Sequence, residues 1–389
     1  MMYFVKFILI IFFFQSSFAY EIFPEYGSLI ASEVDELQAA NKIDSEYQSD
    51  VLTFQKPFAW ETIWLQSKNA FDLSVGSLSG KRFAIENRLK IRQELFENLD
   101  FNFIYFDQSH LEEKSLAHLL EINYWLNSRW AMAVYGEVST QKSEDDVGFA
   151  LIYKPLEYWE NRLFYTATDF SRNQRNELSD RFQKKPASFG FVSRWTKTQE
   201  FFEWAIRSDK QSQWFFPDQN KLHIYTKNYL GFKSRNKVFD HKYLNFQLSL
   251  TERYEEIVEN VEFLKGEYQF QLEGWSFWQG QWLFGIQYVD RIWRQNMGEV
   301  RHKNLLPHLW WKKMNWQLGY ETTLFSAKGP SGLRSGLDTK SFKSEHRLNI
   351  GYEYKFDKAS WRWLFTFDVD RLGSSESWEG GSAQLITWF

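Results

Sequence analysis

Two residues late in the chain have the types and spacing of a nucleophile and its base. Ser344 and His346 are two positions apart, so on an extended strand they share one face, about 7 Å from each other. A serine activated by a histidine is the core of many hydrolases. Leu348 continues the same face, which favours a histidine at an apolar–polar interface over a catalytic base.

The other groups that could do chemistry give weaker patterns. Asp145 and Asp146 are adjacent, but no histidine lies near them in the sequence, which favours solvated loop carboxylates or a loose divalent-cation contact. The seven histidines, at positions 110, 118, 223, 241, 302, 308 and 346, show no metal-binding spacing, and the chain contains no cysteine. We therefore expect no catalytic site, no bound metal and no cofactor.

The charged residues instead follow a period of two, which places them on one face of extended segments. The pattern begins in RFAIENRLKIRQ, residues 82–93, and recurs in 263–275, 346–356 and 360–370. The charged residues predicted to share a polar interior are Arg82, Glu86, Arg88, Lys90, Arg92, Lys265, Glu267, Glu273, Arg347, Glu353, Lys355, Arg362, Asp368 and Asp370. Two interpretations stay open. The charges line a pore that selects ions by sign, or they pair with one another and with a plug.

The elements that must position these side chains are strands, predicted from about residue 71 to the end. Their connections alternate between long and short. Long connections are predicted near 78–81, 108–115, 140–145, 171–186, 209–219, 253–261, 293–302, 326–341 and 371–379. Short turns are predicted near 95–99, 127–129, 155–160, 196–200, 233–241, 278–281, 312–314 and 356–359. The stretch 233–241 is long for a turn on the periplasmic side of the barrel. This organisation predicts an all-β, closed antiparallel transmembrane barrel of roughly 18 strands, with 16 as the alternative.

Both ends of the chain and its composition agree with a barrel in an outer membrane. MMYFVKFILIIFFFQSSFA, residues 1–19, has the features of a signal peptide cleaved after Ala19. The last residues alternate and end on Phe389, which resembles the terminal strand of Gram-negative outer-membrane barrels, read by the barrel assembly machinery. Aromatic residues make up 20% of the chain, yet the mean hydropathy is −0.51. A soluble β-sandwich is the alternative, and the net charge of −4 gives no reason to expect nucleic acid.

Residues 20–70 precede the barrel, which we assign to 71–389. Helical spacing from Ile30 to Ala40 predicts a short helix, and Pro57 begins a second short turn or helix. This segment is either a periplasmic tail or a plug at the inner mouth. The stretch 26–65, with ELQAANKI and then KPFAWETI, resembles the Wzi-like capsule-assembly family. That resemblance implies an outer-membrane barrel with a periplasmic helical portion that helps to hold surface polysaccharide.

Two functions are therefore expected, and the lumen distinguishes them. The first is a passive porin-like conduit for small polar solutes or sugars. The alternative is a capsule or surface-polysaccharide protein with a filled lumen, in which the loop aromatics Trp214, Phe215, Phe216 and Trp378 stack on sugar rings. The expected partners are outer-membrane lipid, lipopolysaccharide and the assembly machinery, together with sugars or polysaccharide.

Overall fold

The chain forms one closed antiparallel β-barrel with a short helix in its interior. The computed structural model describes residues 54–78, 84–109, 114–137, 147–167, 188–209, 212–216, 221–256, 260–295, 298–328 and 343–389. The predicted signal peptide and the predicted helix near residues 30–40 lie outside these ranges. The helix predicted after Pro57 is confirmed as α3, Phe58–Gln66. None of the helices in the described ranges is long and apolar enough to cross a membrane.

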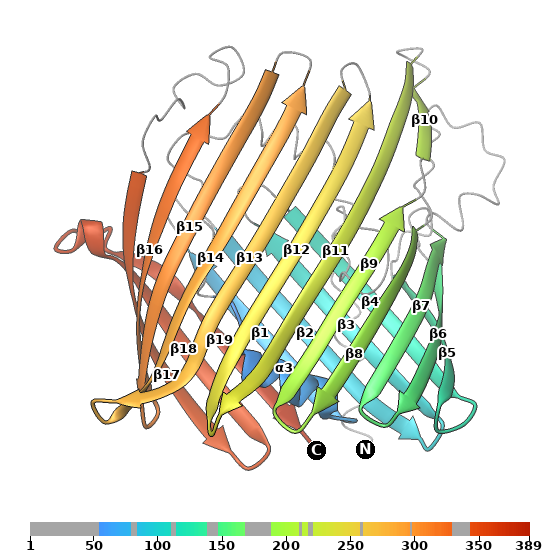
Figure 1. Ribbon diagram of the computed structural model, residues 1–389, viewed down its shortest axis with the longest axis horizontal. Helices are drawn as coiled ribbons and strands as arrows, with labels where there is room; N and C mark the ends of the chain where they lie inside the picture. Colours follow the sequence, from blue (N-terminus) through green and yellow to red (C-terminus); the bar gives the residue numbers. More distant parts are fainter. Residues whose placement is uncertain are drawn as a thin grey trace.

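All strands of the described chain belong to a single sheet (Figure 1). The first half comprises β1 (Ala70–Leu78), β2 (Ala84–Phe96), β3 (Leu99–Ser109), β4 (Lys114–Trp125), β5 (Trp130–Glu137), β6 (Val147–Leu156), β7 (Trp159–Ala167), β8 (Ser188–Lys197) and β9 (Glu200–Asp209). The second half comprises β10 (Ser212–Phe216), β11 (Lys221–Phe239), β12 (Lys242–Glu256), β13 (Asn260–Phe277), β14 (Gly280–Gln295), β15 (Gly298–Lys313), β16 (Trp316–Lys328), β17 (Lys343–Phe356), β18 (Ala359–Asp368) and β19 (Trp378–Trp388).

The barrel closes between its first and last strands. β1 pairs with β2 on one side and with β19 on the other, in a register that runs from Ala70↔Trp388 to Leu78↔Gly380. β10 pairs with β11 alone, while β9 pairs with the lower part of β11. Leaving out β10, the ring is an 18-strand barrel, which confirms the larger of the two predicted strand counts.

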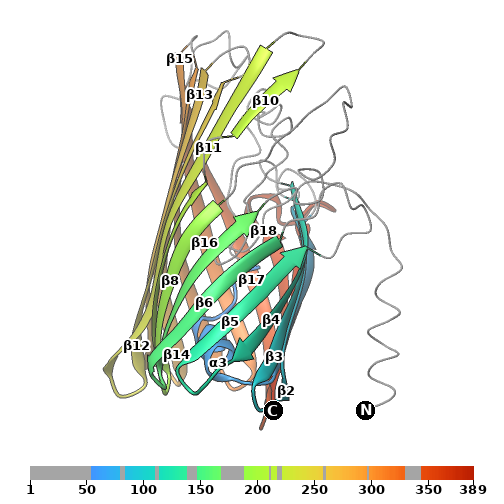
Figure 2. The same cartoon turned by 90° about the vertical axis from the view of Figure 1, so that its right-hand side faces the viewer.

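One wall of the barrel is taller than the rest. Strands β11 to β15 have 15–19 residues, whereas β5 to β9 have 8–10. Figure 2 shows these long strands extending beyond their neighbours. The predicted loops 253–261 and 293–302 were therefore too long, since their ends continue as strand and the connections shrink to 257–259 and 296–297. At the ends of these strands, outward positions carry charged residues instead of apolar ones, as in the pair of Arg294 and Glu262 at 3.0 Å. The alternation of apolar and polar residues that indicates a strand is therefore missing from the sequence there.

The predicted inner turn 233–241 was also wrong, because β11 continues to Phe239 and only Asp240 and His241 form the turn. Its inward residues Lys233 and Arg235 are charged and find partners inside the barrel. Several outward positions beside them are polar, so neither face showed an apolar pattern.

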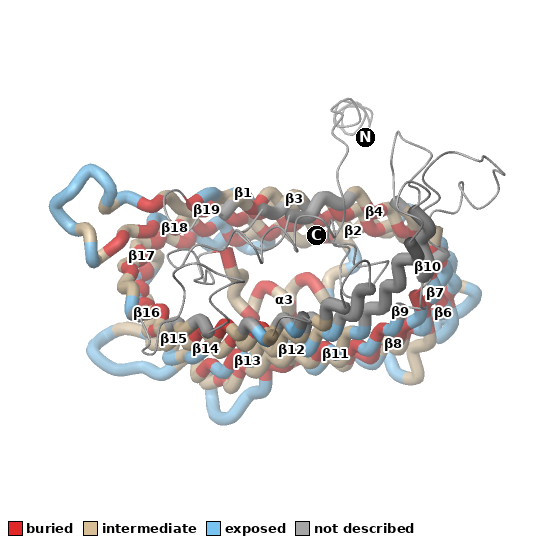
Figure 3. The backbone as a smooth tube through the Cα atoms, turned by 90° about the horizontal axis from the view of Figure 1, so that it is seen from above, coloured by how far each residue is buried: buried red, intermediate tan, exposed pale blue. Residues whose placement is uncertain are grey.

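The two faces of each strand differ in chemistry, as alternation requires. In β18, Arg362 and Thr366 are buried and face inward, whereas Trp361 and Phe365 are exposed on the outside. Seen from above, the barrel is a flattened oval with α3 inside it (Figure 3). Inward apolar side chains pack together at the end of the oval formed by β3 to β9. They are Ile104, Leu119, Ala131, Ala133, Tyr135, Ala150, Ile152, Phe164, Val192 and Ala205.

Candidate functional site: the lumen and its N-terminal segment

Residues 54–67, hereafter the lumen segment, cross the barrel interior and contact opposite walls. Gln55 carries the clearest polar contacts. Its carbonyl oxygen accepts from Arg362 of β18 at 3.1 Å, and its side chain donates to Gln287 of β14 at 3.0 Å. Gln269 of β13 donates to the same side chain at 2.9 Å, and Gln384 of β19 donates to the carbonyl oxygen of Phe54 at 3.0 Å. The segment is thus attached to both long sides of the oval.

The helix α3 is buried on more than one side because its aromatic residues pack on both walls. Trp60 and Trp64 pack with Ala70 of β1 and Ile386 of β19. On the opposite wall the ring of Phe58 stacks on Phe201 of β9, with ring centroids 6.3 Å apart. A helix with large aromatic side chains on more than one side requires such an enclosed position.

The end of α3 is held by a cation from β2. The guanidinium of Arg92 donates to the carbonyl oxygens of Trp64 at 3.0 Å and Ser67 at 3.3 Å. A cation is favourable there because the last carbonyls of a helix lack intrahelical partners and carry partial negative charge. Arg92 also lies over the ring of Trp64, 5.0 Å from its centroid, and Lys90 lies 5.3 Å from the same ring.

Two ion pairs attach the lumen segment to the walls. Lys56 pairs with Asp72 of β1, and both side chains are buried. Glu61 in the first turn of α3 lies 3.4 Å from the ammonium of Lys233 of β11, and these two side chains stay 25% and 29% exposed. The first pair is thus enclosed, whereas the second remains accessible from the interior.

Burial and neighbouring charges shift the pKa of both segment residues. Burial, followed by the charge of Arg88, lowers the pKa of Lys56 to about 7, against the opposing effect of Asp72. Burial alone would raise the pKa of Glu61, but cations hold it well below its ordinary value of 4.5. In order of effect these cations are Lys233, Lys90, Arg88 and Lys56. Docking of the segment therefore favours an ionised Glu61.

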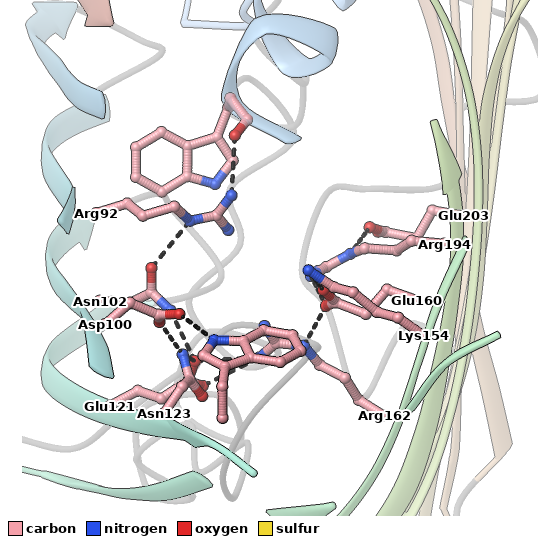
Figure 4. Close-up of polar contacts among 12 residues, drawn as sticks. Arg92, Asp100, Asn102, Glu121, Asn123, Lys154, Glu160, Arg162, Arg194 and Glu203 are labelled. Carbon is pink, nitrogen blue, oxygen red and sulfur yellow. Dashed lines mark hydrogen bonds and ion pairs between the residues drawn. The ribbon is translucent and has the colours of Figure 1, made fainter. Parts of the chain in front are cut away.

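A network of ion pairs fills the interior beside the apolar end of the oval (Figure 4). Arg162 of β7 bridges Glu121 of β4, at 3.1 Å, and Glu160 on its own strand, at 2.5 Å. Arg194 of β8 pairs with Glu203 of β9 at 2.5 Å. Figure 4 shows side chains from the β2–β4 wall and the β6–β9 wall pointing toward one another. At this end of the barrel, charged side chains from the two walls pair across the interior.

The opposite end of the oval also contains paired charges. Arg347 is fully buried and lies 2.6 Å from Glu321 of β16 and 3.4 Å from Glu379 of β19. Glu353 accepts from Lys312 and from Gln317, the latter at 2.8 Å. The described interior therefore contains extensive charge pairing at both ends, and the lumen segment lies between them.

The charged residues predicted from the sequence are distributed over these groups. Inward positions on the strands are taken by Glu86, Arg88, Lys90, Arg92, Lys265, Glu267, Glu273, Arg347, Glu353, Lys355, Arg362 and Asp368. Arg82 lies outside the described ranges. β18 ends at Asp368, so Asp370 falls in the 3-10 turn η4 (Val369–Arg371), where its carboxylate accepts from the backbone N–H of His346 at 2.9 Å.

The predicted catalytic and glycan candidates lie elsewhere. Among the described residues the Nδ1 of His346 contacts the hydroxyls of Tyr320, at 2.8 Å, and Thr322, at 3.2 Å, rather than Ser344. Asp145 and Asp146 lie outside the described ranges. Trp378 begins β19, is half exposed and packs on Phe365 and Phe367. The backbone at Trp214, Phe215 and Phe216 forms β10, but their side chains lie outside the described part.

The sequence analysis missed four residues that hold the lumen segment, namely Gln55, Lys56, Glu61 and Lys233. Glu61 lies in the first helical turn after Pro57, where acidic residues are common. Its presence there therefore did not indicate a partner on the barrel wall. Lys233 lay in the stretch assigned to a turn. Their partners are distant in sequence, and no local pattern indicates such contacts.

Solved barrels from three organisms are similar to this structure. OccK5 (OpdH) of Pseudomonas aeruginosa has a TM-score of 0.41 and 9% identity, covering 82% of this chain and 95% of that chain. OccAB3 of Acinetobacter baumannii has a TM-score of 0.42 and 8% identity, covering 82% and 98%. A loop L8 deletion mutant of OmpT, an outer membrane protein of Vibrio cholerae, has a TM-score of 0.36 and 9% identity, covering 82% and 97%. No family model and no curated protein sequence matches the chain.

Proposed function

We propose that this protein is an outer-membrane channel for small polar solutes, closed at its inner mouth by the lumen segment. The observation that carries the proposal is the crossing of the barrel by residues 54–67, which bind both walls through Gln55. A barrel of 18 strands encloses more space than its own side chains fill. Within the described ranges, the segment that occupies this space is joined to the barrel only through β1 and is otherwise held by non-covalent contacts, so on this proposal it can swing out of the lumen.

The outer surface supports a membrane location. Aromatic residues near the inner turns are exposed on the outside. They are Phe96, Trp130, Trp159, Phe239, Trp278, Trp316 and Phe356. Further up, Tyr268 is exposed in the same way. From Tyr268 in β13 to Trp278 in the turn after it, the chain spans roughly 25 Å at the rise and tilt of a barrel strand, which matches the apolar band of an outer-membrane barrel. Above it the tall wall carries outward ion pairs, as expected of a surface in contact with water and lipopolysaccharide headgroups.

The remaining parts of this assignment also belong to the proposal. Export requires cleavage near Ala19, and assembly uses the carboxyl-terminal strand ending at Phe389, whose backbone N–H donates to Asn69 at 3.1 Å. The polar interior suits solutes that carry hydroxyl, amide or charged groups.

Single-channel recording in planar bilayers tests the channel proposal. We expect small or rare openings for the full chain after removal of the signal peptide, and a larger, steady conductance for a chain that lacks residues 20–68. Both forms must show heat-modifiable gel migration, which reports a folded barrel. Absence of conductance from both folded forms contradicts the channel.

A filled interior also favours the second function, attachment of surface polysaccharide. The charge pairing at both ends of the oval and the crossing segment leave less open space than a simple pore has. This function predicts negligible conductance and retention of polysaccharide through the outer loops, including Trp378. The resemblance of residues 26–65 to the Wzi-like family stays a prediction, because residues 26–53 lie outside the described ranges.

A further inference from the structure

The outer face of the tall wall contains a hollow that reaches the neighbouring strand β9. This outer hollow lies over β9, β11, β12, β13 and β14, which are successive neighbours in the sheet (Figure 1). Its volume of about 660 Å³ is within the range of small-molecule sites, about 300–1,000 Å³. The apolar side chains that line it are Ile206, Leu230, Leu250, Leu264, Tyr268 and Ile292.

Gly266 of β13 forms the floor of the outer hollow, because its position points outward and has no side chain. A Cβ atom there would lie 3.1 Å from the ring of Tyr268 and 3.5 Å from Leu250. Across the paired strands Gly266 lies beside Leu250, Leu250 beside Leu230, and Leu230 beside Ile206. These three aliphatic side chains are exposed. The glycine therefore leaves room next to a row of apolar groups.

The apolar lining continues beyond the membrane band and is surrounded there by charge. Tyr268 marks the outer edge of that band, and Leu264 lies four residues beyond it, paired with Ile292. Leu264 has Glu252 as its other neighbour, and Ile292 has Arg301. Both aliphatic side chains are half-buried. An apolar patch with a charged rim is typical of an interaction site.

The rim of the outer hollow includes a cation that is not neutralised by a neighbour. Asp290 lies opposite Gly266 on one side and opposite Lys303 of β15 on the other. Its carboxylate is nevertheless bound by Arg301, whose Nε donates to it at 2.9 Å. Within the described part of the chain Lys303 forms no ion pair, so it supplies the net positive charge of this group. Two strand spacings, roughly 10 Å, separate it from the floor at Gly266.

We propose that the outer hollow binds lipid A, the membrane-embedded part of lipopolysaccharide, with an acyl chain over Gly266 and a phosphate at Lys303. The hollow requires an acyl chain attached close to an anionic headgroup. It lies at the outer edge of the apolar band, which is the level of the headgroups of the outer leaflet. This inference needs the outer-membrane location alone, and it does not depend on whether the lumen conducts.

Native mass spectrometry of the chain without its signal peptide, in detergent micelles, measures the affinity for the first bound lipid. The probes are lipid A, dephosphorylated lipid A and phosphatidylglycerol, which has a phosphate and two acyl chains. Lys303→Gln removes the cation. Its matched control is Lys313→Gln, on the same outward face of β15 but at the inner turn, where Lys313 donates to Gln279. Gly266→Leu fills the hollow, and Leu264→Gln alters its lining without changing the glycine.

We expect lipid A to bind more tightly than the other two lipids. Loss of one cation near an anionic headgroup should weaken lipid A binding about fivefold in Lys303→Gln, and dephosphorylation should weaken it by a similar factor. Gly266→Leu and Leu264→Gln should weaken it about tenfold, as when roughly two methylene groups lose their apolar contact. Lys313→Gln should bind lipid A like the unsubstituted chain. All variants must show heat-modifiable gel migration, and if Gly266→Leu does not fold, Leu264→Gln carries the test of the hollow.

Three results overturn the inference. The first is equal affinity for the three lipids, which would indicate nonspecific lipid contact. The second is an unchanged affinity for lipid A in Lys303→Gln or in the folded variants of the hollow. The third is a dimer of the chain that Gly266→Leu abolishes, since a second copy would then occupy the hollow. Failure of the channel proposal appears in a different measurement, as absence of conductance from the folded chain that lacks residues 20–68.

Discussion

Replacement of Trp64 by alanine should release the lumen segment from the barrel wall. The indole is 7% exposed and packs with Trp60, Ala70 and Ile386. Truncation of a buried tryptophan costs about 3–5 kcal/mol in a protein core. We take the lower value, because water in the interior can fill the space that the ring leaves. Loss of the cation–π contacts of Lys90 and Arg92 with the same ring adds to this cost.

A loss of about 3 kcal/mol changes the ratio of docked to undocked segment roughly a hundredfold, at 1.4 kcal/mol per factor of ten. The chain has no cysteine, so Thr62→Cys places a single thiol in α3 at a side chain that is 3% exposed when the segment is docked. Its reaction with a water-soluble maleimide should therefore accelerate strongly in the Trp64→Ala background, and channel openings should become longer. Trp278→Ala is the matched control, because that side chain is 83% exposed at an inner turn and faces away from the lumen segment. If Trp64→Ala labels no faster than Trp278→Ala while both barrels stay heat-modifiable, the segment is not held by this packing and the reasoning is wrong.

Three further outcomes follow from the geometry. Docking lowers the pKa of Glu61, so its ionised carboxylate stabilises the docked segment above about pH 4.5, and this stabilisation is lost as the pH falls below that value. The open probability in bilayers should therefore be higher at pH 4 than at pH 7. An equal rise in Glu61→Gln would contradict this. Arg162→Ala removes the cationic partner of the buried Glu121, which should lower the stability of the barrel by about 3–5 kcal/mol and so lower the temperature at which gel migration changes. Arg294→Ala, at an exposed ion pair, should leave that temperature unchanged. Deletion of Phe389 should lower the amount of folded barrel in outer-membrane fractions, and unchanged levels would show that this residue carries no assembly signal.

The barrel itself follows from local patterns in the sequence. Arg88, Leu89 and Lys90 alternate in chemistry because neighbouring strand residues point to opposite faces, and this holds whatever the strand pairs with. The lengths of connections then sort the strands into two directions, which gave the count of 18. The errors lie where the local pattern failed, in the tall wall, where outward positions carry charged residues such as Arg294 and Glu262 instead of apolar ones.

The sequence by itself determined the inward face of most strand residues, with Asp370 as an exception because β18 ends before it, and it left open what the inward residues contact. The contacts of the lumen segment join Gln55 to Arg362 and Phe54 to Gln384, across sequence separations of 307 and 330 residues. Such pairs depend on the curvature of the closed sheet, which brings β1, β2 and β19 to one side of α3 and β9 and β11 to the other. Charge type and strand face are local properties of a chain, whereas the identity of a partner across a lumen is set only when the ring closes.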